Sequence, residues 1–195
     1  IAINWSIYDG IYNQMTSIHW KLFLFLHNLV PTQSFNLLGH KGAYNYFKLL
    51  FNHCFASYKD FIYNITIDGS MLSYLNLYLS KKETPDENYA REIQELFTVG
   101  KRPFSKFTEK DVREIARALV GWTHSYEEIV YDQGSENIPR FEEWNHDTGD
   151  KFFSSFYGNR IIRGKEGQAG AGELQEVVDM IFETQENSIY IARRL

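Results

Sequence analysis

The sequence has one cysteine in 195 residues and fewer basic than acidic side chains. The single thiol, Cys54, cannot form an internal disulfide and offers no thiolate cluster for a structural zinc ion. With 20 Lys and Arg against 25 Asp and Glu, the chain carries a net charge of −5 and shows no basic stripe for binding phosphates. These shortages exclude disulfide-stapled and zinc-finger folds, and we expect no nucleic-acid partner.

Long apolar runs are also missing. The most apolar stretch, residues 20–30, is interrupted by Lys21, His27 and Asn28, whereas a transmembrane helix needs roughly 18 to 20 apolar residues. We therefore expect no transmembrane segment. The chain opens at Ile1 without methionine and ends at Leu195 with no helix stop signal, so we expect a piece of a longer polypeptide.

Aromatic residues, by contrast, are abundant. Phe, Trp and Tyr make up 16% of the chain, with 15 Phe and 13 Tyr, and hydrophobic residues make up 44%. Such a composition is typical of a folded domain whose core is built on rings, and it excludes disorder. At this length we expect a single domain over residues 1–195.

The clearest local signals lie in residues 84–122, which predict two capped helices joined by a short connector. Each helix has an N-cap, an acidic partner that completes a capping box, and a glycine that ends it. These residues are Thr84, Glu87 and Gly100 for the first helix, and Thr108, Asp111 and Gly121 for the second.

Apolar residues recur every three or four positions in most of the chain, which predicts helices within residues 10–122 and 172–195, the last of them capped by Ser188. Residues 123–165 lack this period. Short alternating pieces at 128–131, 151–153 and 160–162 favour a small hairpin or ribbon there. The predicted fold is mainly α, an orthogonal or bundle-like set of helices with an irregular β-ribbon insertion at about 123–165.

The two predicted central helices carry charged faces that allow two interpretations. Acidic and basic side chains spaced by four residues form either an exposed ion ladder, or a polar cleft covered by the rest of the fold. In the second case Glu92 and Glu95 are candidate acids or metal ligands. Sequence alone leaves both open.

His146 and Asp147 are adjacent in the glycine-punctuated segment NHDTGDK, residues 145–151. An imidazole and a carboxylate on a loop can act as base and orienter, or as two metal ligands. The alternative is a turn in which Asp147 binds the backbone of Gly149 while His146 anchors the loop. Neighbouring side chains point apart on an extended chain, which slightly favours the turn.

Three stretches, PDENYAREIQELFTVG, FTEKDVREIARALVGW and NHDTGDK, resemble the core signature of a bacterial family, the domain of unknown function 1800 family. That family usually has a Phe-Trp-His-Asn-His-Phe-like run where this chain has residues 25–30. His27 and Asn28 match the run, but Leu29 replaces its second histidine.

The resemblance implies no established reaction or ligand. It suggests export to the periplasm or cell surface, although the sequence leaves a cytoplasmic location open. It also marks a set of candidate binding residues, namely His27, Asn28, Glu87, Asn88, Arg91, Glu92, Glu95, Arg113, Arg117, Trp122 and Lys151.

Two functions follow as hypotheses. The first is a non-catalytic binding or assembly module of the bacterial envelope, whose partner is an envelope protein or a glycan. The second is a metal-assisted hydrolase with catalytic His146 and Asp147 and a divalent metal. Its predicted metal ligands are His27, Glu92, Glu95 and His146. The hydrolase requires these side chains to lie within coordinating distance of one another.

Overall fold

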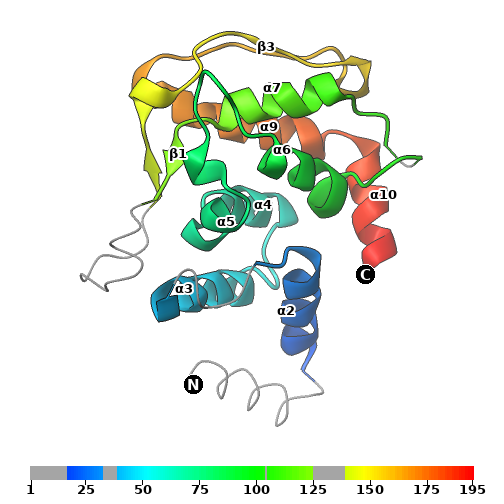
Figure 1. Cartoon of the computed structure of the whole chain (residues 1–195). Helices are drawn as coiled ribbons and strands as arrows, with labels where there is room; N and C mark the ends of the chain where they lie inside the picture. Colours follow the sequence, from blue (N-terminus) through cyan, green and yellow to red (C-terminus); the bar gives the residue numbers. More distant parts are fainter. Residues whose placement is uncertain (1–16, 33–38, 104, 125–138) are drawn as a thin grey trace.

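The structure, a computed structural model, describes residues 17–32, 39–103, 105–124 and 139–195 and is mainly helical, as predicted (Figure 1). Its α-helices are α2 (Ile18–Leu29), α3 (Gly39–Asn52), α4 (Tyr58–Thr66), α5 (Gly69–Tyr74), α6 (Asn88–Glu92), α7 (Glu109–Leu119), α9 (Glu173–Phe182) and α10 (Gln185–Arg194). Helices α7 and α9 pack on each other beneath the extended chain of the β-ribbon, whereas α2 and α3 lie at the opposite end. No helix in these ranges is long and apolar enough to cross a membrane.

Two small antiparallel sheets interrupt the helices. Strand β1 (Trp122–Thr123) pairs with β2 (Arg140–Phe141), and β3 (Lys151–Phe152) pairs with β4 (Ile161–Ile162). The second pair confirms the predicted ribbon, while the predicted strand at 128–131 lies outside the described residues. Short 3-10 helices, η1 (Leu77–Leu79), η3 (Glu143–Asn145), η4 (Ser155–Tyr157) and η5 (Gly167–Gly172), connect these elements.

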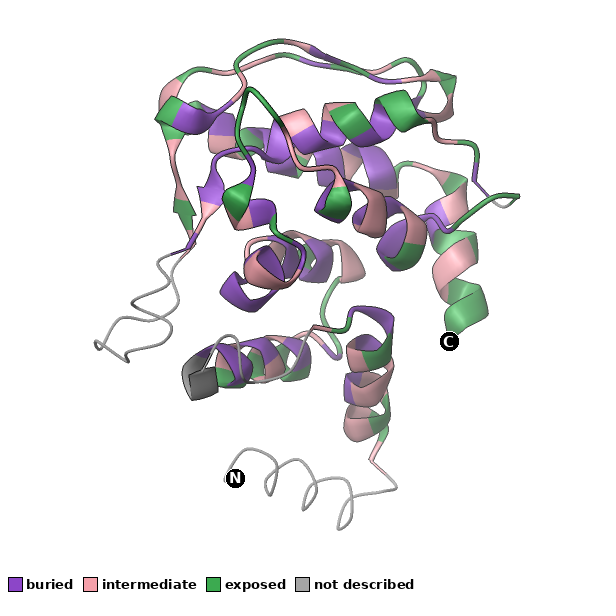
Figure 2. Cartoon of the chain, in the orientation of Figure 1, coloured by how far each residue is buried: buried purple, intermediate pink, exposed green. Residues whose placement is uncertain are grey.

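Buried residues recur along most of the helices (Figure 2). They include tyrosines whose hydroxyl groups are hydrogen-bonded within the protein. The hydroxyl of Tyr46 donates to the carbonyl of Val30 at 2.7 Å, and that of Tyr89 donates to Thr66 Oγ1 at 2.8 Å. A buried hydroxyl without a partner would cost about 1–3 kcal/mol. These bonds therefore let rings with polar ends fill the core, as the composition predicts.

The capping predictions for the central helices were half right. Thr108 caps α7, and its reciprocal hydrogen bonds with Asp111 complete the capping box. Thr84 does not cap a helix, because it forms an isolated β-bridge with Lys81 and the helix begins only at Asn88. Thr84, which the sequence pattern assigned to the helix start, instead closes the turn at 81–84.

The first central helix changes geometry part-way. After α6, residues Ile93–Thr98 form a π-helix, η2, which the regular apolar period did not predict. Fully buried Gln94 lies within it, donating from Nε2 to the carbonyl of Ala90 and accepting at Oε1 from the Tyr157 hydroxyl, both at 2.8 Å. The π-helix ends at Thr98, and Gly100 follows soon after it with φ +83°, the left-handed conformation that was predicted there and that favours glycine.

Helix α10 begins earlier than predicted. It starts at Gln185, so the prediction that Ser188 caps it was wrong. Thr184 precedes the helix in extended conformation, but its hydroxyl donates to the carbonyl of Ile181 at 2.6 Å and thus closes the end of α9. Only two residues, Glu183 and Thr184, separate the two helices.

Candidate functional site

Helix α7 presents a polar face to the extended chain above it. Asp111, Glu114 and Arg117 are three residues apart, so their side chains lie along one side of the helix. Asp111 accepts the backbone N–H and the hydroxyl of Ser154, both at 2.7 Å. Glu114 Oε2 accepts the backbone N–H of Phe152 at 2.9 Å. The helix carboxylates therefore bind backbone donors at and just beyond strand β3.

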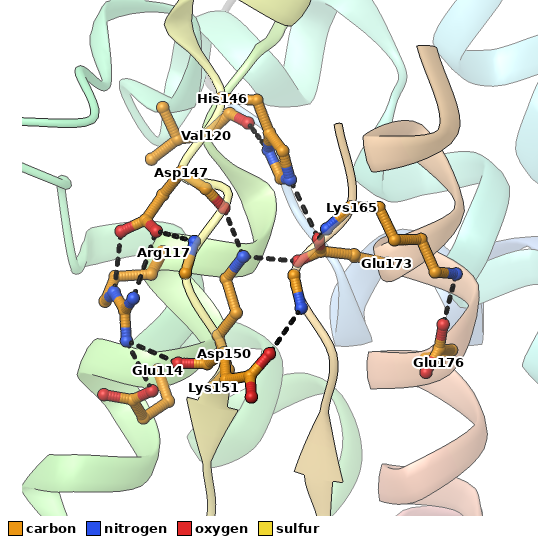
Figure 3. A network of polar contacts seen from close by, with 12 residues as sticks. Glu114, Arg117, Val120, His146, Asp147, Asp150, Lys151, Lys165, Glu173 and Glu176 are labelled. Atoms are coloured by element: carbon orange, nitrogen blue, oxygen red, sulfur yellow. Dashed lines mark hydrogen bonds and ion pairs between the residues drawn. The ribbon is translucent and has the colours of Figure 1, made fainter. Parts of the chain in front are cut away.

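Arg117 binds Asp147 in the NHDTGDK loop, residues 145–151, through a two-pronged contact (Figure 3). Its Nε and Nη2 lie 2.7 and 3.0 Å from the two carboxylate oxygens, and its Nη1 lies 2.8 Å from Glu114 Oε2. Asp147 Oδ1 also accepts the N–H of Gly149 at 2.8 Å, so the predicted turn exists. Burial alone would raise the pKa of Asp147, but the bonds from Arg117 and Gly149 outweigh it and lower the pKa.

His146 points the other way, into the interior between the loop and α9. Its Nδ1 lies 2.7 Å from the carbonyl of Val120, and its Nε2 lies 3.0 Å from Glu173 Oε1. Glu173 Oε2 lies 2.6 Å from Lys151 Nζ, and Oε1 also accepts the N–H of Lys165 at 2.8 Å. The side chains of His146, Lys151 and Glu173 are all completely buried.

The hydrogen-bond partners of His146 define what its ring can do. Both ring nitrogens face oxygen atoms inside the protein, the carbonyl of Val120 and the carboxylate of Glu173. The ring is also enclosed, because a Cβ on Gly170 would lie only 2.5 Å from its Cδ2. With both nitrogens bonded inside the protein and its side chain completely buried, His146 is not placed to take a proton from a dissolved substrate.

His146 and Asp147 do not act on a common atom in this arrangement. Asp147 is directed at Arg117 on α7, whereas His146 is directed at Glu173 on α9. Lys151 Nζ contacts the backbone carbonyl of Asp147 and so links the two halves of the network. The result is a chain of buried and half-buried ion pairs that fastens the loop to both helices.

The polar face of α6 differs from that of α7. Arg91 forms ion pairs with Glu87 at 3.1 Å and with Glu109 at 2.7 Å, and Lys101 lies 3.0 Å from Glu95. Glu109 is 68% exposed and Arg91 is 32% exposed, so these pairs form a solvated ladder that contributes little to stability. On this helix the ladder interpretation fits the structure, whereas the 145–151 loop covers the face of α7.

Glu92 is the carboxylate on α6 whose burial is not balanced by a hydrogen bond to each of its oxygens. Its Oε2 is buried and has no hydrogen-bond partner among the residues that the structure describes. Burial, followed by the charge of Glu95, raises the pKa of Glu92, while Lys101 and Arg91 act in the opposite direction. The carboxyl therefore favours its protonated form more than an exposed glutamate does.

The other predicted binding residues have separate surroundings. His27 Nδ1 lies 3.1 Å from the Tyr46 hydroxyl oxygen, and burial lowers the pKa of His27. Trp122 is nearly buried, with its ring 5.4 Å from that of Phe141. Asn88 donates from its backbone N–H to Asp86 at 2.8 Å, whereas Asn28 and Arg113 are exposed.

The predicted metal ligands are not assembled into a site. Within residues 17–32, 39–103, 105–124 and 139–195, no group of three or more His, Cys, Asp or Glu side chains is arranged to hold a metal ion. His27, Glu92, Glu95 and His146 all belong to these ranges. The clustering that the hydrolase hypothesis requires is therefore not found there.

A family model described as "Protein of unknown function (DUF1800)" matches residues 2–195. The chain belongs to this family. The match confirms the resemblance carried by the three signature stretches and extends it over nearly the whole DUF1800 chain. Searches of curated proteins and of solved structures found no match. The family description names no reaction and no ligand.

Sequence reasoning missed Glu173, the central acid of this DUF1800 network. One signal was present: Lys151 lies two residues before Phe153 in the alternating strand pattern and so shares its inward face. A lysine on a buried face needs an acidic partner. The sequence could not say which acid, because Glu173 follows the glycine-rich η5 at the start of another helix.

Proposed function

We propose that this chain is a non-catalytic binding or assembly module of the bacterial envelope. One observation carries the proposal: charged residues of its signature are used for internal contacts. His146 and Lys151 are completely buried against Glu173, and Arg117 is paired with Asp147 and Glu114. Side chains paired in this way fix the position of the 145–151 loop on α7 and α9, and they are not free to react with a substrate.

The exposed surface supports a binding role. Several large apolar side chains are accessible, including Trp144 at 69%, Phe55 at 65% and Tyr44 at 52%. Exposed aromatic rings give large contact areas at low conformational cost, and they are enriched in binding surfaces. The envelope location rests on the resemblance to a bacterial family whose members commonly look exported.

The hydrolase hypothesis has weaker support. A general base needs a free lone pair within reach of the substrate, and both nitrogens of His146 face acceptors inside the protein. No other observation favours this second function.

Co-sedimentation tests the proposal. Purified protein is mixed with cell-wall and membrane fractions from a bacterium that encodes a member of the family, and the bound fraction is measured after centrifugation. We expect saturable binding to at least one fraction, reduced by Tyr44→Ala, Phe55→Ala or Trp144→Ala at unchanged melting temperature. Lys106→Ala, also at an exposed position, is the matched control. Protein that stays in the supernatant with every fraction would refute the proposal.

A further inference from the structure

A small groove opens between helix α3, the junction of α4 with α5, and the chain at Pro139. Its volume is about 270 Å³, close to the lower end of the range for ligand pockets, roughly 300–1,000 Å³. Leu49, Ile67 and Pro139 give it apolar walls. This size suits a ligand of one ring rather than a nucleotide or a peptide.

Four polar side chains line the same groove, and they offer both donors and acceptors. Asn45 and Lys48 come from α3, Asn64 comes from α4, and Asp68 comes from the α4–α5 junction. The Nδ2 of Asn64 lies 2.8 Å from the carbonyl oxygen of Asp60 and 3.3 Å from His53 Nε2, so its amide donors have partners within the protein and Oδ1 is the group that it can offer to a ligand. The residues that line the groove thus carry one ammonium, two amides and one carboxyl, without a strong excess of either charge.

Asp68 is the most buried of the four, at 8% exposure. Its Oδ1 accepts the backbone N–H groups of Ser70 at 3.0 Å and Met71 at 3.3 Å, which fixes the carboxyl group. Burial raises the pKa of Asp68 to about 7, although these hydrogen bonds oppose the shift. Near neutral pH the carboxyl can therefore donate as well as accept a hydrogen bond.

An exposed aromatic ring contacts one of these polar residues, Lys48. Tyr44 is 52% exposed and precedes Asn45 on α3. The Nζ of Lys48, one helical turn further on, lies 5.8 Å from the centroid of the Tyr44 ring. The contact places the ring beside a groove-lining cation and leaves about half of its surface to solvent.

We propose that this groove, with Asn45, Lys48, Asn64 and Asp68 as its polar lining and Tyr44 at its edge, binds a single uncharged pyranose unit of a glycan. A pyranose carries adjacent hydroxyls that both donate and accept, and one face of C–H groups that can pack on a ring. The inference rests on the proposed function, because it names the partner class of the binding module.

Other ligand classes fit the groove less well. An anion would pair with Lys48 but would meet the Asp68 carboxyl, and a simple cation would meet Lys48. A zwitterionic amino acid would need Asp68 to be ionised, yet burial of its carboxyl favours the protonated form up to about neutral pH. Hydroxyl groups are compatible with either form of Asp68.

Nuclear magnetic resonance of the ¹⁵N-labelled full chain tests the proposal. The probes are the methyl glycosides of glucose, galactose, mannose and N-acetylglucosamine, with free alanine as a zwitterionic control. We expect at least one glycoside to shift the side-chain amide signals of Asn45 and Asn64 in a saturable way. Tyr44→Ala and Lys48→Ala, both at exposed positions, should weaken the binding of that glycoside at least tenfold, whereas Lys106→Ala, at an exposed position away from the groove lining, should leave it unchanged.

Three results would overturn the proposal: no glycoside shifts these amides, alanine alone shifts them, or the Tyr44→Ala and Lys48→Ala variants bind as tightly as the unmodified chain. Failure here is distinguishable from failure of the binding module itself. If the chain co-sediments with envelope material and Tyr44→Ala and Lys48→Ala do not reduce that binding, the module stands and the groove is not its site.

Discussion

Arg117 and Asp147 face each other through two parallel hydrogen bonds, with Nε 2.7 Å from Oδ2 and Nη2 3.0 Å from Oδ1. The two residues belong to different signature stretches, one on α7 and one in the NHDTGDK loop. Their contact joins the stretches into one structural unit, in which α7 holds the loop and the loop covers the polar face of α7.

Arg117→Lys should destabilise the protein by about 1–3 kcal/mol, because an ammonium group cannot reproduce the two-pronged contact with Asp147. Arg113→Lys is the matched control, since Arg113 lies on the same helix but is exposed. That variant should change the free energy of unfolding by no more than about 0.5 kcal/mol. Urea denaturation of both variants measures the difference, and equal effects would contradict the role given to Arg117.

Gly164→Ala should be strongly destabilising. A Cβ at this position would lie 1.9 Å from the backbone carbonyl oxygen of Thr148, so the loop and the chain after β4 would have to separate. We expect the free energy of unfolding to fall by at least about 1–3 kcal/mol. Gly172→Ala, whose Cβ would approach only the flexible Lys165 Nζ at 3.5 Å, should change stability by less than about 1 kcal/mol. Thermal melts of the two variants compare them directly, and a tolerated Gly164→Ala would show that the packing is looser.

The two threonines predicted as helix caps offer a paired test. Thr108→Ala should cost about 0.5–2 kcal/mol, because Thr108 Oγ1 accepts the N–H of Asp111 at the start of α7. Thr84→Ala should cost less than about 0.5 kcal/mol, because Thr84 is exposed and precedes no helix. Guanidinium denaturation measures the free energy of unfolding of both variants. A larger loss of stability in Thr84→Ala than in Thr108→Ala would contradict the assignment of Thr108 as the helix cap.

Asp68 predicts a specific dependence of stability on pH. Because its folded pKa of about 7 is above the usual value of 3.8, the folded state binds more protons than the unfolded state between these values. This group's contribution should therefore fall as pH rises from about 4 to 7, by at most ~1.4 kcal/mol per pH unit.

Asp68→Asn isolates that contribution, since asparagine also caps helices but does not ionise. Unfolding free energies measured across this pH range should decline more for the unmodified chain than for the variant. Parallel profiles would show that Asp68 ionises normally in the folded protein.

Local sequence signals predicted the parts of the fold that depend on neighbouring residues. The capping box of Thr108 and Asp111, the left-handed Gly100 and the pairing of β3 with β4 follow from patterns a few residues long. Thr84 lies in a similar sequence pattern, but it pairs with Lys81 in a β-bridge and does not cap a helix. The π-helix was not predictable because its apolar spacing looks helical and its buried Gln94 is paired with distant Tyr157.

The candidate site shows the same division. The sequence identified His146, Asp147 and Lys151 as candidate site residues. It also predicted the turn from Asp147 to Gly149 as one of two alternatives. It could not identify Glu173, which lies 27 residues beyond His146 and reaches it only through packing of α9. The partner of a buried charge is fixed by tertiary structure, so the choice between an active site and a structural network depends on contacts between residues far apart in the sequence.

A double-mutant cycle on Lys151 and Glu173 tests the central claim most directly, namely that the signature network is structural. Lys151→Met and Glu173→Gln each leave a buried charge without its partner, and each should lower the free energy of unfolding by about 3–5 kcal/mol. The double variant should lose clearly less than the sum, with a coupling above about 1 kcal/mol. Single variants as stable as the unmodified chain, or a coupling of zero, would contradict the account.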